Sequence, residues 1–376
     1  MSNNENNEIR DSFTSKTGFI LACIGSAVGM GNIWLFPYRV GQFGGAAFLI
    51  PYIIFIVLLG YTGLMGEFAF GRMTQTGPIG SFKKALETKN KNWGGFLGII
   101  PVIGAFGIAV GYAVVVGWFL RFLGGFITGS AMSAADSGAY FGELASPFGS
   151  IIWHLLALIL VSIVLISGIS KGIETMNKIM MPAFYILFVI VMVRVFMLDG
   201  AFEGIKYLVV PKWSSLMEPK TWIYALGQAF FSLSLAGSGM IVYGSYLKRD
   251  VDIMSSAKNT VIFDTLGAFL AGLVIIPAVF AFNLDPASGP PLLFITIPSV
   301  FKLMPFGRLF GVIFFISVLF ASITSLMNLL EVPIEAVQST FKLKRKLSVF
   351  IVVGATFIFG LFAEDKDANI TINIIN

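Results

Sequence analysis

The stretch Gly25-Ser-Ala-Val-Gly-Met-Gly-Asn32 interrupts the first long apolar run of the chain. Three of its eight residues are glycine, and glycine costs a helix about 1 kcal/mol relative to alanine. A second interruption, Ser232-Leu-Ser-Leu-Ala-Gly-Ser-Gly239, lies in the sixth apolar run. Together the two stretches predict helices that are broken near their midpoints. Close packing of helices at small residues would explain either stretch taken alone.

The composition around these stretches excludes a water-soluble protein. Of the 376 residues, 56% are hydrophobic and 12% are charged, whereas soluble domains carry about 25% charged residues. The single cysteine, Cys23, and the single histidine, His154, exclude a disulfide framework and a thiolate or histidine metal centre. The net charge of +5 is typical of basic cytoplasmic loops in a membrane protein, so no nucleic-acid partner is expected.

Nine apolar runs are long enough to cross a lipid bilayer, which requires about 20 residues per helix. They cover about 17–40, 44–71, 94–127, 148–168, 172–199, 220–246, 257–284, 306–339 and 346–364. With a cytoplasmic N-terminal segment over 1–16, most of the 25 Lys and Arg residues lie in cytoplasmic segments. The sequence therefore predicts a multi-pass protein of the cell membrane with a cytoplasmic N-terminus.

Interrupted segments at corresponding positions of two halves of a membrane protein indicate a transporter binding site near the bilayer midplane. A broken helix exposes N–H groups with partial positive charge and C=O groups with partial negative charge. Because lipid cannot pair with these groups, a carboxylate suits the N–H groups and a small cation suits the C=O groups. An intramembrane enzyme and a channel fit the sequence less well, since no catalytic pair is evident and helix ends of mixed sign favour an occluded site.

The residues from Gly25 to Tyr38 resemble the first-helix signature of the neurotransmitter:sodium symporter family. Further matching motifs cover Gly44–Tyr52, Glu67–Arg72, Gly168–Glu174, Gly227–Leu235 and Ala287–Pro290. The resemblance implies an all-α polytopic membrane protein with a five-plus-five inverted repeat, the leucine-transporter fold, in which helices 1 and 6 are broken. It also implies a symporter that imports an amino acid with sodium, since the bacterial members are the most similar, and it implies no enzyme activity.

On this fold, the first five-helix repeat spans 17–199, an external loop spans 200–219 and an incomplete second repeat of four helices spans 220–364. The Pro- and Gly-rich segment at about 285–305 is expected to form an external lid, with a plain connector as the alternative. The tail 365–376 resembles nothing in the family, so the tenth and later helices are expected to be missing. The alternative function is therefore a truncated, non-transporting remnant of such a symporter that can still bind sodium or substrate. The sequence neither requires nor excludes an oligomer.

The resemblance implies two sodium sites made of hard oxygen donors, which suit a hard cation. The first site maps to the Ala27 carbonyl and to Asn32, Ser232 and Asp264. The second site maps to the carbonyls of Gly25, Val28 and Ala321 and to the hydroxyls of Thr324 and Ser325. From the residues alone, these two hydroxyls could instead bond to their own helix backbone.

Asp264 lies inside the apolar run from Thr260 to Phe282, where insertion of an acid costs about 2.5–3.5 kcal/mol. Many family members have a neutral Asn at this position and bind chloride nearby. The positions that match their chloride ligands are Tyr52, Gln228, Ser232 and Ala268, and an alanine supplies no ligand. We therefore expect Asp264 to carry the negative charge, so that chloride is not required. A proton-accepting Asp264 that exchanges protons against sodium is the alternative.

The resemblance places the substrate carboxylate near the Met30 and Gly31 N–H groups, the first sodium and the Tyr112 hydroxyl. The other residues assigned to the substrate site are Ser26, Ala27, Gly29, Ile108, Phe230, Phe231, Ser232, Ser234, Gly237, Ser325 and Leu329. Phe230 is expected to belong to an outer lid. Bulky residues can occupy the Gly237 position in relatives, so the bare glycine predicts a large apolar or aromatic amino acid as substrate.

The gates depart from the family pattern. Many relatives form an outer gate with an arginine at the position of Leu35, so this gate is expected to close differently. The inner-gate residues that match are Arg10, Phe13 and Tyr246. Ser339 occupies the position of the acid that pairs with the arginine in relatives, and the sequence assigns neither Glu331 nor Glu335 to that role.

Overall fold

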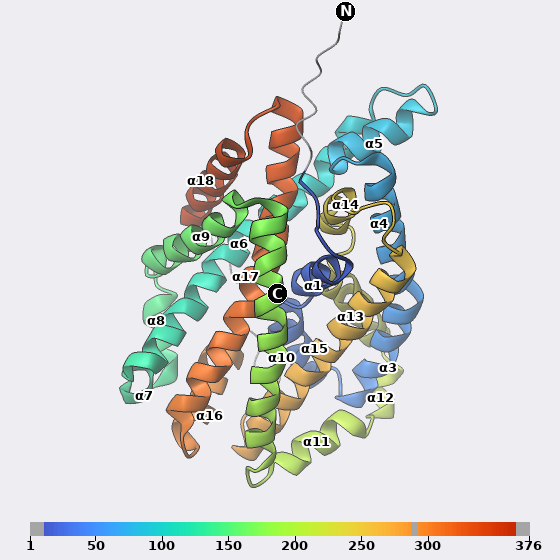
Figure 1. Cartoon of the computed structure of the whole chain (residues 1–376). Helices are drawn as coiled ribbons and strands as arrows, with labels where there is room; N and C mark the ends of the chain where they lie inside the picture. The colour runs from blue at the N-terminus through green and yellow to red at the C-terminus, as the bar shows by residue number, and fades with distance from the viewer. Residues whose placement is uncertain (1–10, 287–291, 366–376) are drawn as a thin grey trace, which may run out of the picture.

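The computed structural model describes residues 11–286 and 292–365, and every regular element within these ranges is helical (Figure 1). The elements up to residue 196 are α1 (Lys16–Ala27), η1 (Gly31–Leu35), α2 (Phe36–Gln42), α3 (Ala46–Phe55), η2 (Ile56–Gly60), α4 (Tyr61–Thr74), α5 (Pro78–Glu87), α6 (Gly94–Thr128), α7 (Ser130–Ser133), α8 (Ser137–Leu144), α9 (Ile151–Ile166), η3 (Ile169–Glu174) and α10 (Thr175–Phe196). The later elements are α11 (Ala201–Val209), α12 (Trp213–Leu216), α13 (Pro219–Ser232), α14 (Gly239–Ser245), α15 (Ile253–Ala281), η4 (Leu292–Thr296), α16 (Ile297–Leu303), α17 (Gly307–Phe341) and α18 (Arg345–Glu364). The elements labelled η are π-helical turns.

The long helices α6, α10, α15 and α17 run between the two ends of the molecule (Figure 1). Helix α17 packs along both α6 and α10. On the α6 side, the buried rings of Phe122 and Phe126 stack on Phe315 of α17, with ring centroids 5.4 and 5.3 Å apart. Such aromatic pairs stabilise a helix contact beyond the area they bury. We call the packed pair α6 and α17, which lies beside the broken helices, the scaffold.

Short helices cover one end of the molecule, where α7, α11, α12 and α16 gather, and α5 lies at the other end (Figure 1). The ring of Phe294 in η4 is fully buried and stacks on Phe141 of α8 and Phe119 of α6, at 5.0 and 5.1 Å. The part of the expected lid from Leu292 to Leu303 is thus a packed helical segment. The matching motif Ala287–Pro290 lies outside the described residues.

The first apolar run breaks where the glycines predict. Helix α1 ends at Ala27, and Val28 adopts an extended conformation with φ −76° and ψ 102°. Helical structure resumes at Gly31, and the two pieces are bent by 49° relative to each other. In the last turn of α1, the Ile24 carbonyl still accepts the Val28 N–H group at 2.7 Å, while the carbonyls after it lie at the end of the helix, where the regular helical pairing stops.

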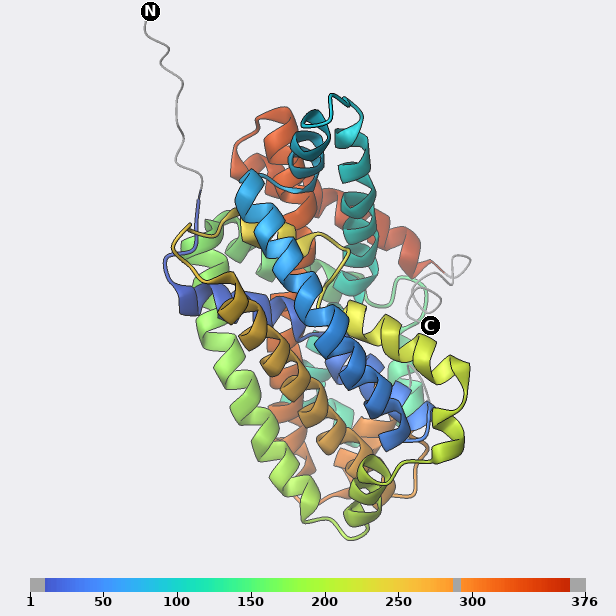
Figure 2. The same cartoon turned by 90° about the vertical axis from the view of Figure 1, so that its right-hand side faces the viewer.

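The sixth run breaks between Ser232, the last residue of α13, and Gly239, the first of α14. Within the break, Ser234, Ala236 and Ser238 have left-handed φ values of 54°, 65° and 60°. Three residues with side chains therefore hold the conformation that usually favours glycine. The second view shows α3 and α4 continuing as one rod beside α13 (Figure 2), and α4 supplies a partner to the break, described below.

Each of the nine predicted runs coincides with a helix or a broken helix, but fewer of them pass as membrane spans by length and composition. Within the described ranges, six helices pass, and the bent pair Lys16–Ala27 and Gly31–Gln42 makes up to seven. The helix in the fourth run, Ile151–Ile166, is shorter, and the sixth run consists of the separate helices α13 and α14. The number nine therefore stays a prediction, while several apolar spans are present.

Candidate functional site

A buried carboxylate lies beside both helix breaks. Asp264 of α15 is fully buried, and the Asn32 Nδ2 group, just after the first break, donates to its Oδ1 at 2.8 Å and to its backbone oxygen at 3.1 Å. The hydroxyl of Ser232, at the end of α13, lies 2.9 and 2.8 Å from the two carboxylate oxygens. Three of the four residues predicted for the first sodium site are thus in direct contact, and the fourth, Ala27, ends α1.

A second group of oxygens joins α1 to α17. The Ser325 hydroxyl donates to the Ser26 carbonyl in the last turn of α1 at 3.1 Å. Gly25 and Thr324 are close neighbours, since a Cβ atom added to Gly25 would lie 2.9 Å from the Thr324 Cβ. The Thr324 hydroxyl donates to the Phe320 and Ala321 carbonyls of its own helix, at 3.0 and 2.9 Å. This self-bonded arrangement is the alternative anticipated for a hydroxyl at this position.

A cavity of about 90 Å³ lies between the breaks and the scaffold. Of the residues predicted for the substrate site, it is lined by Ser26, Ala27, Gly29, Gly31, Ile108, Tyr112, Phe231, Ser234, Gly237, Ser325 and Leu329. Met30 lines a neighbouring cavity instead, and Phe230 and Ser232 line neither of these two cavities. The cavity is therefore lined by eleven of the fourteen residues predicted for the substrate site.

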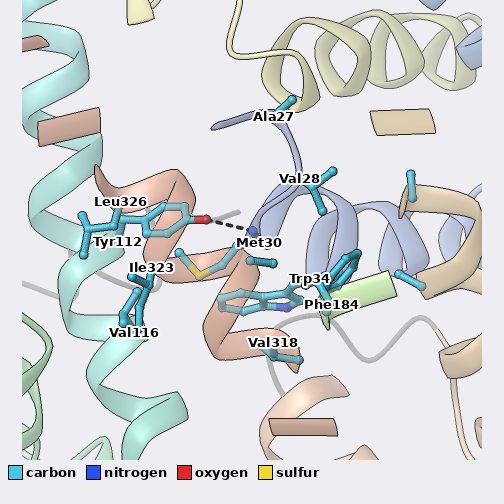
Figure 3. Close-up of a cluster of buried hydrophobic side chains, with 14 of the residues drawn as sticks. Ala27, Val28, Met30, Trp34, Tyr112, Val116, Phe184, Val318, Ile323 and Leu326 are labelled. Carbon is cyan, nitrogen blue, oxygen red and sulfur yellow. Dashed lines mark hydrogen bonds between the residues drawn. The ribbon is translucent and has the colours of Figure 1, made fainter. Parts of the chain in front are cut away.

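The N–H group of Met30 donates to the Tyr112 hydroxyl oxygen at 2.9 Å (Figure 3). The figure shows the Tyr112 ring reaching from α6 toward the break in the first helix, with Met30 and Trp34 packed beside α17. This N–H group was predicted to bind the substrate carboxylate. In this structure the phenol oxygen of Tyr112 is its acceptor, so the two groups predicted to share the carboxylate are adjacent.

A second, larger cavity of about 410 Å³ lies on the other side of Ile108, Tyr112 and Phe231, which line both cavities. Leu35 and Arg39 line it one helical turn apart, and Arg39 is the only charged residue among the described lining residues. The Arg39 guanidinium lies 4.2 Å from the centre of the Tyr224 ring. Leu35 replaces the arginine that forms the outer gate in many relatives, and one turn away Arg39 makes a cation–π contact with Tyr224.

The predicted inner gate is only partly brought together. Phe13 is buried, and its N–H group donates to the Tyr246 carbonyl at 3.3 Å. The Tyr246 hydroxyl donates to Glu331 Oε1 at 2.8 Å. Ser339, in contrast, bonds to the carbonyl of Ala336 in its own helix. Arg10 lies outside the described residues.

Two acids that the sequence left unassigned have clear partners. Glu331 is fully buried and accepts two hydrogen bonds from the Arg345 guanidinium. Glu67 of α4 accepts the Ala236 N–H group of the second break at 2.8 Å. The rule that flags Asp264, an acid in an apolar run, would also have found Glu331 and Glu67.

The chain matches known proteins over most of its length. A model of the sodium:neurotransmitter symporter family matches residues 10–132 and 141–376. An uncharacterised sodium-dependent transporter of Bacillus subtilis (strain 168) is 40% identical over 338 residues, 89% of this chain and 74% of that protein. An uncharacterised sodium-dependent transporter of Haemophilus influenzae is 32% identical, over 98% of this chain and 83% of that protein.

Among solved structures, the crystal structure of MhsT in complex with L-phenylalanine matches with a TM-score of 0.88 and 37% sequence identity. The match covers 95% of this chain and 82% of that chain. These coverages do not support the expectation of a truncated chain. The family match extends to residue 376 and so includes the tail over 365–376, which was expected to resemble nothing in the family.

Proposed function

Because the chain belongs to the sodium:neurotransmitter symporter family, we propose that it imports an amino acid by coupling its movement to sodium. The family and its relatives are transporters, so the chain is a sodium-dependent, multi-pass membrane transporter and not an enzyme. The proposal concerns the substrate, the residues that bind it and the ions, and the requirement for chloride.

The observation that carries the proposal is the contact of Asp264 with Asn32 and Ser232 beside both helix breaks. An ionised carboxylate in an apolar helix is stabilised by a counter-charge or a bound cation, and a carboxyl group without either takes up a proton. The first sodium site is proposed at this cluster, with the Ala27 carbonyl. The second is proposed at the carbonyls of Gly25, Val28 and Ala321 and the hydroxyls of Thr324 and Ser325.

The substrate is proposed to bind in the 90 Å³ cavity, with its carboxylate at the Tyr112 hydroxyl, the N–H groups of the first break and the first sodium. A large apolar or aromatic side chain would point toward Gly237. Two observations support this. A Cβ atom on Gly237 would approach only the Ser234 carbonyl oxygen, at 3.9 Å, and MhsT was crystallised with L-phenylalanine.

Transport is proposed to be chloride-independent, because Asp264 supplies a fixed negative charge beside the first sodium. Ala268, one turn further along α15, offers no hydroxyl to an anion. We also propose the cytoplasm as the side of the N-terminus and alternating access as the mechanism. In it, the broken helices move against the scaffold of α6 and α17.

The test is sodium-dependent binding of a panel of amino acids to the purified full chain. Asp264→Ala and Ser325→Ala should each weaken binding at least about tenfold, since a hydrogen bond or ion contact to a charged group is worth about 1.5–3 kcal/mol. Matched controls are Thr260→Ala and Ser317→Ala, whose hydroxyls bond to their own helices α15 and α17. Binding of amino acids at full strength in potassium or choline would overturn the proposal.

A further inference from the structure

Asn177 carries an oxygen atom that the described residues leave without a partner. It is the third residue of α10 and is fully buried. Its Nδ2 group donates to the carbonyl of Ile173 at 2.8 Å. That bond fixes the orientation of the amide, because only the nitrogen can donate to a carbonyl. The Oδ1 atom must therefore point the other way, and it accepts no hydrogen bond from any described residue.

This oxygen points at the last turn of α1. A Cβ atom added to Gly25 would overlap Asn177 Oδ1 and lie 2.9 Å from the Thr324 Cβ. Asn177, Gly25 and Thr324 thus converge from α10, α1 and α17. Only a residue without a side chain leaves room at position 25 for the amide oxygen to approach the backbone. The three residues meet at the last turn of α1, where the regular helical pairing stops.

A buried amide oxygen without a partner costs free energy comparable to a lost hydrogen bond. Its close neighbours are Gly25 and, beside Gly25, Thr324; both supply oxygens to the second proposed sodium site, and the Thr324 hydroxyl already donates within α17. At the end of α1 the Ser26 carbonyl accepts the Ser325 hydroxyl, whereas Asn177 Oδ1 has no donor among the described residues, and a cation beside it would supply the missing partner. Neutral amide, carbonyl and hydroxyl oxygens are the donors that a hard monovalent cation accepts.

We propose that Asn177 Oδ1 is a ligand of the second sodium ion, added to the five oxygens from α1 and α17. The inference rests on the proposed function, because it extends the second of the two proposed sodium sites. It connects a third helix, α10, to that ion. Helix α10 follows directly after the π-helical turn η3, and such turns are frequent at functional sites. Binding of sodium therefore fixes the start of α10 against α1 and α17.

The test compares Asn177→Ala with a matched control, Asn259→Ala. Asn259 of α15 makes the same bond, from Nδ2 to the carbonyl four residues earlier, at 2.8 Å, so both variants lose an identical helical hydrogen bond. For the purified chain, the sodium concentration that gives half-maximal binding of a radiolabelled amino acid is measured. It should rise about five- to tenfold in Asn177→Ala and stay at the wild-type value in Asn259→Ala.

A second readout does not depend on substrate. Sodium that binds the folded state raises the melting temperature Tm of the detergent-solubilised chain. At a fixed sodium concentration, the rise relative to choline should be smaller in Asn177→Ala than in the wild type and Asn259→Ala. The variant Asn177→Asp keeps an oxygen at the same place and adds a negative charge. Its half-maximal sodium concentration at pH 8 should be at or below the wild-type value.

The outcomes separate this inference from the proposed function. If wild-type binding and Tm do not depend on sodium, both the proposed function and the inference are overturned. If the wild type depends on sodium and Asn177→Ala responds as Asn259→Ala does, only the inference is overturned. An equal rise of the half-maximal sodium concentration in Asn177→Ala and Asn177→Asp would also contradict the inference, because the side-chain oxygen would then make no difference to sodium binding.

Discussion

The guanidinium of Arg345, the first residue of α18, holds both carboxylate oxygens of Glu331 in α17, with Nη1–Oε1 and Nη2–Oε2 distances of 2.9 and 2.8 Å. The Glu331 side chain is fully buried, and the Arg345 side chain is 16% exposed. Tyr246, the residue directly after α14, donates its hydroxyl to the same carboxylate. Glu331 therefore connects the second broken helix to α17 of the scaffold.

Arg345→Ala should destabilise the chain by about 3–5 kcal/mol, because it leaves the buried Glu331 carboxylate without its counter-charge. The measurement is the Tm of the purified chain in detergent, which should fall clearly below the wild-type value. Lys346→Ala is the control, since the neighbouring lysine is exposed. A double variant, Glu331→Gln with Arg345→Ala, should recover part of the lost Tm. No recovery would mean that the pairing itself is not the source of the effect.

Substrate binding by the wild type should be the same in sodium chloride and sodium gluconate, because Asp264 supplies the negative charge. Asp264→Asn removes that charge and should weaken sodium-dependent binding in both salts. Adding Ala268→Ser provides a hydroxyl at a fully buried position one turn away. This double variant should regain binding in chloride only. The single variant Ala268→Ser is the control and should remain indifferent to chloride, and a chloride requirement of the wild type would contradict the prediction.

Gly237→Phe should shift selectivity from large to small amino acids. The position has open space, since a Cβ atom would approach only the Ser234 carbonyl, and its φ is not left-handed. A ring there fills the cavity instead of straining the backbone. Competition binding with phenylalanine, leucine, alanine and glycine measures the change, and we expect phenylalanine to lose at least about tenfold relative to alanine, within the range for a misfitted apolar pocket. Unchanged ranking of the four ligands would refute the pocket assignment.

Gly71→Ala should lower the Tm, because the added Cβ would overlap the Ile241 carbonyl oxygen and lie 2.8 Å from the Ser245 nitrogen. Both atoms are backbone of α14, so the two helices must separate, at a cost of about 1–3 kcal/mol. Gly66→Ala on the same helix is a matched control, since no atom lies within 4 Å of its Cβ position. We expect it to keep or raise the Tm, because alanine is the better helix former.

Much of the site could be predicted from the sequence because lipid penalises specific residues. Asp264 is an acid in an apolar run, and an acid in a membrane helix is costly enough to indicate a functional role. The glycines at 25, 29 and 31 destabilise a helix, so they indicate the position of the first break. The contacts of Asn32 and Ser232 with Asp264 agree with the grouping predicted for the first sodium site. The assignment of sodium to that cluster stays a prediction.

Other features depend on how distant segments meet. Arg345 reaches Glu331 only because α18 turns back against α17, and nothing in the local sequence specifies that turn. Asn177 lies on an ordinary helical stretch, and its unpaired oxygen becomes visible only once α1 approaches α10 through Gly25. Phe230, predicted to belong to the outer lid, lines neither cavity. It lies two residues before the end of α13, where the sequence alone does not show which way a side chain of the helix points.

The conformation of the second break has a consequence for affinity. Its left-handed positions hold Ser234, Ala236 and Ser238 rather than glycines, and Glu67 fixes the Ala236 N–H group. Residues with side chains sample fewer backbone states than glycine, so the unwound segment has little conformational entropy to lose when a ligand arrives. The cavity is therefore preorganised, which lowers the entropic cost of holding a ligand there.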